Sequence, residues 1–145
     1  MECEPASPSE REEGCALILA LGWNINRIQL GDPFVAKDGD EVVGFLRLED
    51  GEPDGTYVAD VVVREDVRGR GIGSELMRVA MAACSGPFFL SCHSERMAFY
   101  ERLGFAETAK GGIPPAVAAV AAIAGEAAGE LETAEDHIHH FMRAG

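Results

Sequence analysis

The chain has 145 residues, with 25 Asp and Glu against 12 Lys and Arg and a formal net charge of −13 at pH 7. This acidity excludes nucleic acid as an expected partner, and no apolar run is long enough to cross a membrane. The length and the 47% hydrophobic content predict a single globular domain over residues 1–145.

The N-terminal segment is acidic and polar, and it lacks the apolar run of a secretory signal. Residues 1–8 are expected to be frayed, or to form a short first strand at most. The spacing of Ser9 and Glu12 fits a capping box and predicts a helix from there to Gly22, with Leu17 and Leu19 on its core-facing stripe. The four scattered cysteines form no CxxC pair, so we expect free thiols and a cytoplasmic location.

A hairpin is predicted next, because Asp38-Gly39 separates the apolar runs 34–37 and 41–49. Gly44 within the second run indicates a bulge or a close backbone approach. The segment 57–63 is a continuous apolar run, which is typical of a strand covered on both faces.

A glycine-rich turn follows this strand directly, and an amphipathic helix over 72–83 begins at its end. Glycines let the backbone approach a ligand, and the unpaired amides of a helix N-terminus bind phosphate or pyrophosphate. The spacing excludes a nucleotide P-loop, which needs Gly-Lys-Ser/Thr, and a dinucleotide fingerprint, which needs a third glycine two residues further on. Arg68 and Arg70 add positive charge. The turn therefore predicts a site for a phosphate-bearing ligand, but one that is neither a nucleotide P-loop nor a dinucleotide-binding turn.

The run Arg68-x-x-Gly71-x-Gly73 behind the valine strand resembles the pyrophosphate motif of the Gcn5-related N-acetyltransferase (GNAT) family. The resemblance implies that acetyl-CoA is the cosubstrate. Its pyrophosphate would lie on the turn, and its pantetheine arm would bond to the strand backbone. The cofactor-binding residues that it implies are Val61, Val62, Val63, Arg68, Gly69, Arg70, Gly71, Ile72, Gly73 and Ser74.

A second motif lies further along the chain. A strand is predicted over 88–93, and a helix from its N-cap Ser94 to a stop at Gly104. The run Phe99-Tyr100-x-x-x-Gly104-Phe105 resembles the later FYxKxGF motif of the same family, which implies that Tyr100 is the catalytic acid that protonates the departing thiolate. The resemblance covers residues 42–105. It implies an α/β (α+β) acyl-CoA N-acyltransferase fold, a mixed, mostly antiparallel sheet flanked by helices and splayed between the 57–63 and 88–93 strands.

The remaining segment, 111–145, is expected to form a variant C-terminal helix and strand. Prolines followed by alanines predict a helix over 113–124, which would cover the acceptor pocket or make a homodimer contact. A strand over 137–142 is expected to pair with one over 105–109. His137 and His139 would share a strand face, but no ligand cluster of matching spacing lies elsewhere, so no metal is expected.

The tail resembles that of amino-acid N-acetyltransferases of the N-acetylglutamate-synthase-like type, which carry an LPPAVR-like helix and a CMRL-like strand. Residues 113–117 and 141–143 fit this outline, but the basic residues expected in the helix are missing, which argues against an acidic acceptor. By the family resemblance, Trp23 and Asn24 are candidates for contact with the acceptor.

These motifs together predict an enzyme that transfers acetyl from acetyl-CoA to the primary amine of a small molecule or amino acid, by direct attack in a ternary complex. Backbone N–H groups near Val62 and Val63 would polarise the carbonyl. The base is left open between Asp60 or Glu65, acting through water, and solvent. Three alternatives also stay open: a peptide or protein amine as acceptor, a non-catalytic acyl-CoA sensor, and an acyl group other than acetyl.

Overall fold

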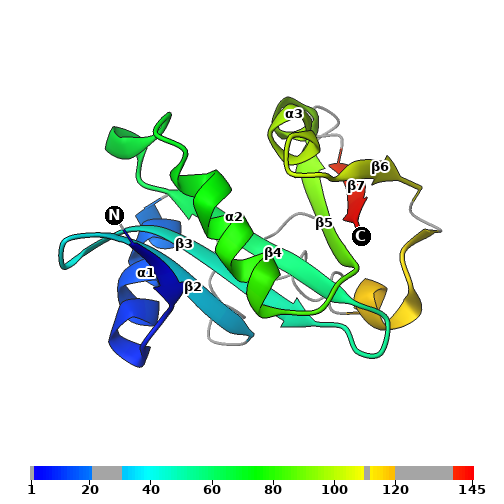
Figure 1. The fold of residues 1–145 in the computed structure, drawn as a ribbon, viewed down its shortest axis with the longest axis horizontal. Coiled ribbons are helices and arrows are strands. Elements are labelled where there is room, and N and C mark those ends of the chain that lie inside the picture. The colour runs from blue at the N-terminus through cyan, green and yellow to red at the C-terminus, as the bar shows by residue number, and fades with distance from the viewer. Residues whose placement is uncertain (1, 21–30, 110–111, 120–138) are drawn as a thin grey trace.

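The computed structural model describes residues 2–20, 31–109, 112–119 and 139–145. Within these residues one sheet has the strand order β1-β2-β3-β4-β5-β7-β6 (Figure 1). All neighbouring strands are antiparallel except β4 and β5, which are parallel. The strands are β1 (Glu2–Pro5), β2 (Asp32–Asp38), β3 (Glu41–Asp50), β4 (Thr56–Val63), β5 (Phe88–His93), β6 (Ala106–Thr108) and β7 (His139–Ala144).

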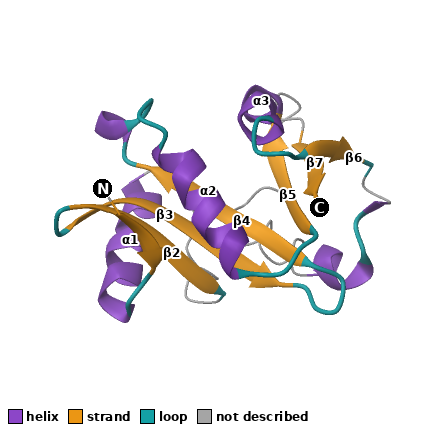
Figure 2. Cartoon of the chain, in the orientation of Figure 1, coloured by secondary structure: helices purple, strands orange, loops and turns teal. Residues whose placement is uncertain are grey.

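Besides the helical residues 115–119, three α-helices and two short 3-10 helices accompany the strands in the described part of the chain (Figure 2). They are α1 (Pro8–Ala20), η1 (Glu65–Val67), α2 (Ile72–Ala83), η2 (Ser94–Arg96) and α3 (Met97–Glu101). Buried residues of α1 and of α2 belong to separate apolar clusters on the sheet, so the two helices cover opposite faces. No helix among the described residues is long and apolar enough to span a membrane.

The N-terminal segment forms strand β1, which pairs with β2 from Glu2 to Pro5, so the alternative of a short first strand is confirmed and that of a frayed end is wrong for these residues. The capping box of α1 also lies two residues earlier than predicted. The Ser7 backbone N–H donates to Glu10 Oε1 at 2.9 Å, and the Glu10 N–H donates to Ser7 Oγ at 3.3 Å. Pro8 fits the first helical position because its missing N–H would have no partner there.

Helix α1 therefore presents a different face to the sheet than its leucines suggest. Gly14, Cys15 and Ile18 are buried, whereas Leu19 is 53% exposed, which corrects the predicted stripe. A Cβ on Gly14 would lie 2.1 Å from the Phe45 ring, so the helix packs on β3 at the distance that only glycine permits.

The predicted hairpin of β2 and β3 is confirmed, and the register shifts beside Gly44, where Ala36 faces Gly44 and Lys37 faces Val42. A Cβ on Gly44 would lie 3.0 Å from Leu76 of α2, so the glycine serves both a bulge and a close approach. A second register shift lies between β3 and β4, where Arg47 faces Asp60 and Leu48 faces Val58.

The sheet opens between β4 and β5. The two strands pair only at Thr56 with Phe88 and Tyr57 with Phe89, at the start of each strand. Beyond this point they diverge, as Figure 1 shows, and no described strand pairs with the β5-facing edge of β4 there. The splay predicted between these two strands is thus confirmed.

The C-terminal strand β7 lies between β5 and β6 and pairs with both. The predicted pairing of 137–142 with 105–109 is therefore confirmed at Phe141 and Met142, and it extends to Arg143, whereas 137 and 138 lie outside the described residues. Residues 115–119 are helical, and Val117 is buried against Tyr57 and Phe89, where β4 and β5 meet. Asp54 Oδ2 accepts the Ala116 N–H at 3.2 Å, which anchors this helical segment. Residues 120–124 lie outside the described part.

Candidate active site

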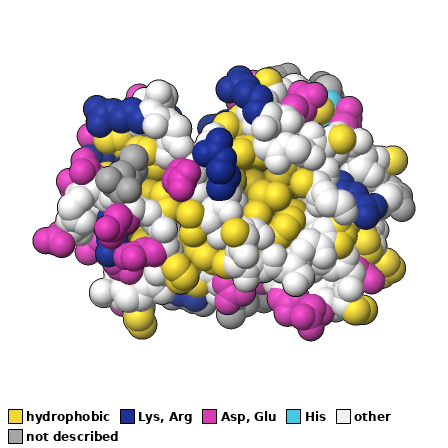
Figure 3. Space-filling view, viewed as in Figure 1, with side chains coloured by type: hydrophobic (Ala, Val, Ile, Leu, Met, Phe, Trp, Pro, Cys, Tyr) yellow, Lys and Arg dark blue, Asp and Glu magenta, His cyan; other side chains and the backbone are white. Residues whose placement is uncertain are grey.

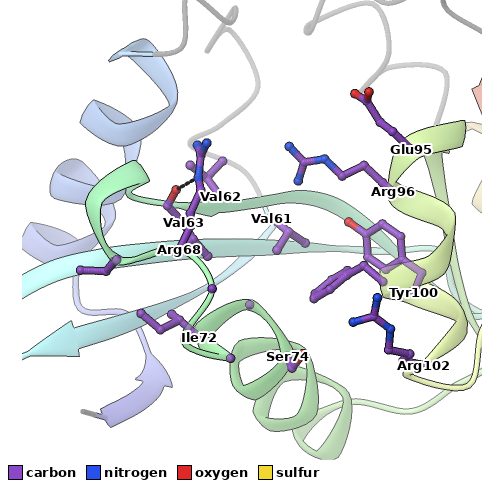
Figure 4. Close-up of a pocket in the computed structure, with 15 residues that line it drawn as sticks. Val61, Val62, Val63, Arg68, Ile72, Ser74, Glu95, Arg96, Tyr100 and Arg102 are labelled. Atoms are coloured by element: carbon purple, nitrogen blue, oxygen red, sulfur yellow. Dashed lines mark hydrogen bonds between the residues drawn. The ribbon is translucent and has the colours of Figure 1, made fainter.

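A cleft of about 440 Å³ lies where β4 and β5 diverge. One wall is formed by the end of β4 and the glycine turn, and the other by η2 and α3 (Figure 4). Lys and Arg side chains gather beside a notch on this face, with hydrophobic surface below it (Figure 3). The described residues that line the cleft are Val61, Val62, Val63, Val67, Arg68, Gly69, Gly71, Ile72, Gly73, Ser74, Glu95, Arg96, Phe99, Tyr100 and Arg102.

All the predicted coenzyme residues except Arg70 line this cleft. Their backbone conformation explains the glycines. Gly69 has φ +84° and Gly71 has φ +79°, values that favour glycine. Gly71 is also the N-cap of α2, which begins at Ile72 as predicted. The first amides of this helix have no intrahelical acceptor, so they carry partial positive charge toward the cleft.

Arg68 fastens the turn to the strand. Its Nε donates to the Val63 carbonyl oxygen at 2.9 Å, the bond drawn as a dashed line in Figure 4. The Arg68 guanidinium therefore lies at the same wall as the helix N-terminus. This wall combines a fixed cation, left-handed glycines and free amides, which is a suitable arrangement for a pyrophosphate.

Tyr100 stands on the opposite wall, on α3, with only 9% of its surface exposed. Its hydroxyl group points into the cleft, toward the β4 wall, in Figure 4. Its ring packs edge-on against Phe99, with centroids 5.0 Å apart, and against Phe105, at 5.9 Å. Burial raises the pKa of Tyr100 to about 12, so the phenol is protonated throughout the physiological pH range.

Four cleft residues on this wall were not singled out from the sequence: Glu95, Arg96, Phe99 and Arg102. They lie within or beside the Phe99-Tyr100 motif, so the motif's helical spacing could have indicated them. Phe99 also supports the opposite wall, because a Cβ on Gly73 would lie 3.2 Å from its Cζ. Phe99 of α3 therefore contacts the start of α2, and the two walls meet there.

The two carboxylates considered as the base are placed elsewhere. Asp60 Oδ2 accepts from Arg47 Nε at 2.8 Å, and Arg47 also pairs with Glu49. The Arg47 side chain is only 3% exposed, so Asp60 is held in a nearly buried ion pair. Glu65 begins η1, and neither Glu65 nor Asp60 is among the described residues that line the cleft.

Polar side chains of β7 and β6 and of the start of η2 bond to one another. His140 Nε2 lies 2.9 Å from Ser94 Oγ, and His140 Nδ1 lies 2.5 Å from Glu107 Oε2. Ser94 is the first residue of η2, and its hydroxyl group pairs with His140 and does not cap the helix. The predicted N-cap role of Ser94 is therefore wrong. Across the residues that the structure describes, no group of three or more His, Cys, Asp or Glu is placed to hold a metal. His137, Trp23 and Asn24 lie outside these residues.

The acetyltransferase (GNAT) domain family model matches residues 29–107, which is more than half of the chain. This match includes the glycine turn and the Tyr100 motif. No curated protein sequence matches the chain at a significant level.

Solved structures share the fold over nearly the whole chain. Rv2747 from Mycobacterium tuberculosis, in complex with CoA and NLQ, has a TM-score of 0.71 at 18% identity and covers 99% of this chain and 98% of its own. Escherichia coli ElaA has a TM-score of 0.68 at 17% identity and covers 99% of both chains. An acyl-CoA N-acyltransferase from Pseudomonas aeruginosa has a TM-score of 0.65 at 18% identity, with 99% and 97% covered.

These neighbours confirm the predicted acyl-CoA N-acyltransferase fold, with its mixed sheet and flanking helices. The family match carries the activity, because it spans both motifs from which the function was predicted. The chain therefore belongs to the GNAT family, and it is an acetyltransferase that uses acetyl-CoA as its acetyl donor.

Proposed function

We propose that acetyl-CoA binds in the cleft between β4 and α3 and that its acetyl group passes to the primary amine of a small molecule or amino acid. The observation that carries this proposal is the convergence of the two sequence motifs. Arg68, Gly71 and Ile72 on one wall face Tyr100 on the other across about 440 Å³. In this arrangement the turn and the α2 N-terminus hold the pyrophosphate, and the open edge of β4 from Val61 to Val63 bonds the pantetheine amides.

The reaction is a direct attack. The amine nitrogen, once it has lost a proton to water, attacks the thioester carbonyl carbon and forms the N–C bond. The nitrogen then releases its second proton to water, and the C–S bond breaks and leaves the thiolate of CoA. The backbone N–H groups of Val62 and Val63 stabilise the negative charge that develops on the carbonyl oxygen. The products are an N-acetylated amine and free CoA.

Tyr100 is the proposed hydrogen-bond donor to the departing sulfur, the position at which the family resemblance implies an acid. Its pKa of about 12 keeps the proton on the phenol, so the residue is always available as a donor. A thiol has a pKa of about 8.5 and is the stronger acid. A hydrogen bond from Tyr100 to the developing thiolate is therefore its main contribution, and the thiolate takes its proton from water.

The acceptor is proposed to be small. Supporting this, Ile113 and Val117 cover the sheet where β4 and β5 meet. The tail's likeness to amino-acid N-acetyltransferases points the same way. The missing basic residues in the 113–124 segment disfavour an acidic acceptor.

The test is thiol release from acetyl-CoA with a panel of amino acids, simple amines, polyamines and lysine peptides. We expect turnover with free amino acids or simple amines that exceeds turnover with peptides. Preference for peptides would replace the small-molecule acceptor with a protein amine. Binding of acetyl-CoA without turnover on any member would contradict the proposed acceptor class and favour a sensor.

A further inference from the structure

A second tyrosine lies where the splay between β4 and β5 begins. Tyr57 is paired with Phe89 in the last residue pair that joins the two strands. The Tyr57 hydroxyl oxygen lies 3.1 Å from Ser91 Oγ. Ser91 is two residues beyond Phe89, about 7 Å further along β5. The Tyr57 side chain therefore crosses from β4 to β5 just past the last pair, and it bridges the narrow end of the splay.

This narrow end is closed on both faces of the sheet. On one face Tyr57 is 4% exposed and packs in the cluster of Phe89 and Val117. The next residue, Val58, points to the other face. There Val58 and Leu90 are buried in the apolar cluster that includes the inner side of α2. A chain that entered the splay from the cleft would therefore meet packed side chains at this depth.

The open part of the splay ends close to the bridge. Tyr57 and Phe89 are paired in parallel strands, so the bond to Ser91 lies level with Ala59 of β4. Val61, which lines the cleft, is two residues further on, a separation of about 7 Å along the strand. The space between Val61 and the bridge is therefore short.

The bridge is also near the reacting end of the cleft. The pKa of Tyr100 is raised chiefly by burial, and the nearby Cys92 and Tyr57 add to the rise. Because such electrostatic effects fall with distance, Tyr57 lies near the Tyr100 phenol. The coenzyme arm, which is proposed to run along β4 from Val63 to Val61, would carry its acyl group onward in the direction of Tyr57.

We propose that Tyr57, held in place by Ser91, forms the end of the acyl pocket and restricts the donor to acetyl-CoA among acyl-CoA thioesters. This inference rests on the proposed function, because it takes the coenzyme arm to lie along β4. Propionyl-CoA fits poorly and butyryl-CoA is excluded, since each added methylene must displace a buried aromatic ring from its packed position. Tyr57 thus determines specificity for the donor and takes no part in proton transfer.

The test varies the acyl chain and the size of the side chain at position 57. Acetyl-, propionyl-, butyryl- and hexanoyl-CoA are assayed by thiol release with one fixed mixture of amino acids, polyamines and lysine peptides. The Kd of each thioester and of CoA is measured by equilibrium titration. The variants are Tyr57→Leu, which shortens the side chain, and Tyr57→Phe, which keeps the ring and loses the bond to Ser91.

The control variant is Phe89→Leu, which removes an aromatic ring from the same cluster. The Phe89 ring reaches back toward the residue before β4, because a Cβ on Gly55 would lie 3.0 Å from Phe89 Cε2. Phe89→Leu should therefore lower stability without lengthening the acyl pocket.

Wild type should prefer acetyl-CoA to butyryl-CoA by about 100-fold or more in kcat/KM, since one methylene in an apolar pocket changes this ratio by about 10- to 200-fold. Tyr57→Leu should reduce the preference to within about tenfold by raising kcat/KM for butyryl-CoA. Tyr57→Phe should be intermediate, and Phe89→Leu should keep the wild-type preference. If the mixture contains no acceptor, the Kd values decide, and wild type should bind butyryl-CoA about tenfold or more weakly than acetyl-CoA.

Equal use or equal binding of acetyl-CoA and butyryl-CoA by wild type would refute the inference and leave the acetyltransferase proposal in place. An unchanged preference in Tyr57→Leu that folds and binds CoA would assign the limit to other residues. Should Tyr57→Leu fail to fold, a full wild-type preference in Tyr57→Phe would contradict the role of the Ser91 bond. No binding of CoA by wild type would contradict the proposed function itself, and the inference would fall with it.

Discussion

The side chain of Arg68 is bonded to the backbone of Val63, with 2.9 Å between Nε and the carbonyl oxygen. This bond joins the glycine turn to the strand that precedes it, across five residues of chain. The last carbonyl of β4 thereby accepts a hydrogen bond, and Arg68 is held where it lines the cleft. The position of the cation is thus fixed before any ligand arrives.

Replacing this arginine is predicted to weaken coenzyme binding. Arg68→Ala should raise the Kd for CoA by about 10- to 100-fold, because one charge-assisted contact and the bond to Val63 are both lost. Arg70→Ala is the matched variant, since Arg70 lies in the same turn but not among the residues that line the cleft. Its Kd should stay within about threefold of wild type. Equal losses in the two variants would mean that only the general charge of the turn matters.

The left-handed conformation of Gly71 is predicted to be needed for CoA binding. Gly71→Ala should cost about 1 to 2 kcal/mol of unfolding free energy, because alanine is strained at φ +79° although no atom lies within 4 Å of its Cβ. Gly39→Ala, at φ +65° in the β2–β3 turn, carries the same strain far from the cleft. Urea denaturation should show similar losses of unfolding free energy for both variants. CoA titration should show weaker binding only for Gly71→Ala. Unchanged CoA binding in Gly71→Ala would show that the left-handed turn is not needed for the ligand.

Tyr100→Phe tests the proposed hydrogen-bond donor. The variant should keep its CoA affinity and lose about 100-fold or more in kcat, as expected when a donor to developing charge is removed. The aromatic packing with Phe99 and Phe105 is retained, so stability at neutral pH should change little. Steady-state kinetics beside thermal denaturation separate the two effects. A kcat within threefold of wild type would exclude Tyr100 from the chemistry.

The raised pKa of Tyr100 also predicts a pH dependence of stability. The folded protein holds the phenol proton up to about pH 12, whereas the unfolded chain releases it near the ordinary tyrosine pKa of 10.0. The native state therefore binds more protons in this window, and wild type should lose up to roughly 2 to 3 kcal/mol as the pH rises through it. Tyr100→Phe should not show this loss. Tyrosinate absorbance gives a direct check, since the chain has 2 tyrosines and the variant retains only Tyr57.

Asp60 is predicted to stabilise the fold and not to act as the catalytic base. Asp60→Asn should lower the unfolding free energy by about 1 to 3 kcal/mol, because it weakens the nearly buried pair with Arg47. The shape of the pH profile of kcat/KM should stay as in wild type. Loss of the acidic limb of that profile in Asp60→Asn would return Asp60 to the role of base.

The local motifs were the part of the molecule that could be predicted from sequence. Helix α2 has the expected bounds, because Gly71 supplies the left-handed N-cap and the apolar spacing defines its buried face. Gly104, at φ +96°, ends the Tyr100 helix as expected. Such features depend on neighbouring residues alone, and they include most of the predicted coenzyme site.

The features that the sequence did not predict depend on contacts between residues that are far apart in the chain. Ser94 looks like an N-cap, but its hydroxyl bonds to His140, 46 residues away in the chain. Ser9 and Ser7 both precede a glutamate at capping-box spacing, and only Ser7 is placed at the end of β1, where the helix begins. Arg47 and Asp60 face each other only because a register shift intervenes between β3 and β4. Pairings of this kind depend on sheet register, which local spacing does not reveal.

The most direct test of the account follows the acetyl group itself. The protein is incubated with acetyl-CoA that carries an isotopically labelled acetyl group and with a mixture of free amino acids, and the products are identified by mass spectrometry. We predict a labelled N-acetyl amino acid in amounts equal to the CoA released, and its near absence with Tyr100→Phe. Labelled acetyl-CoA that binds in the cleft but yields no labelled amine would contradict acetyl transfer to a small acceptor.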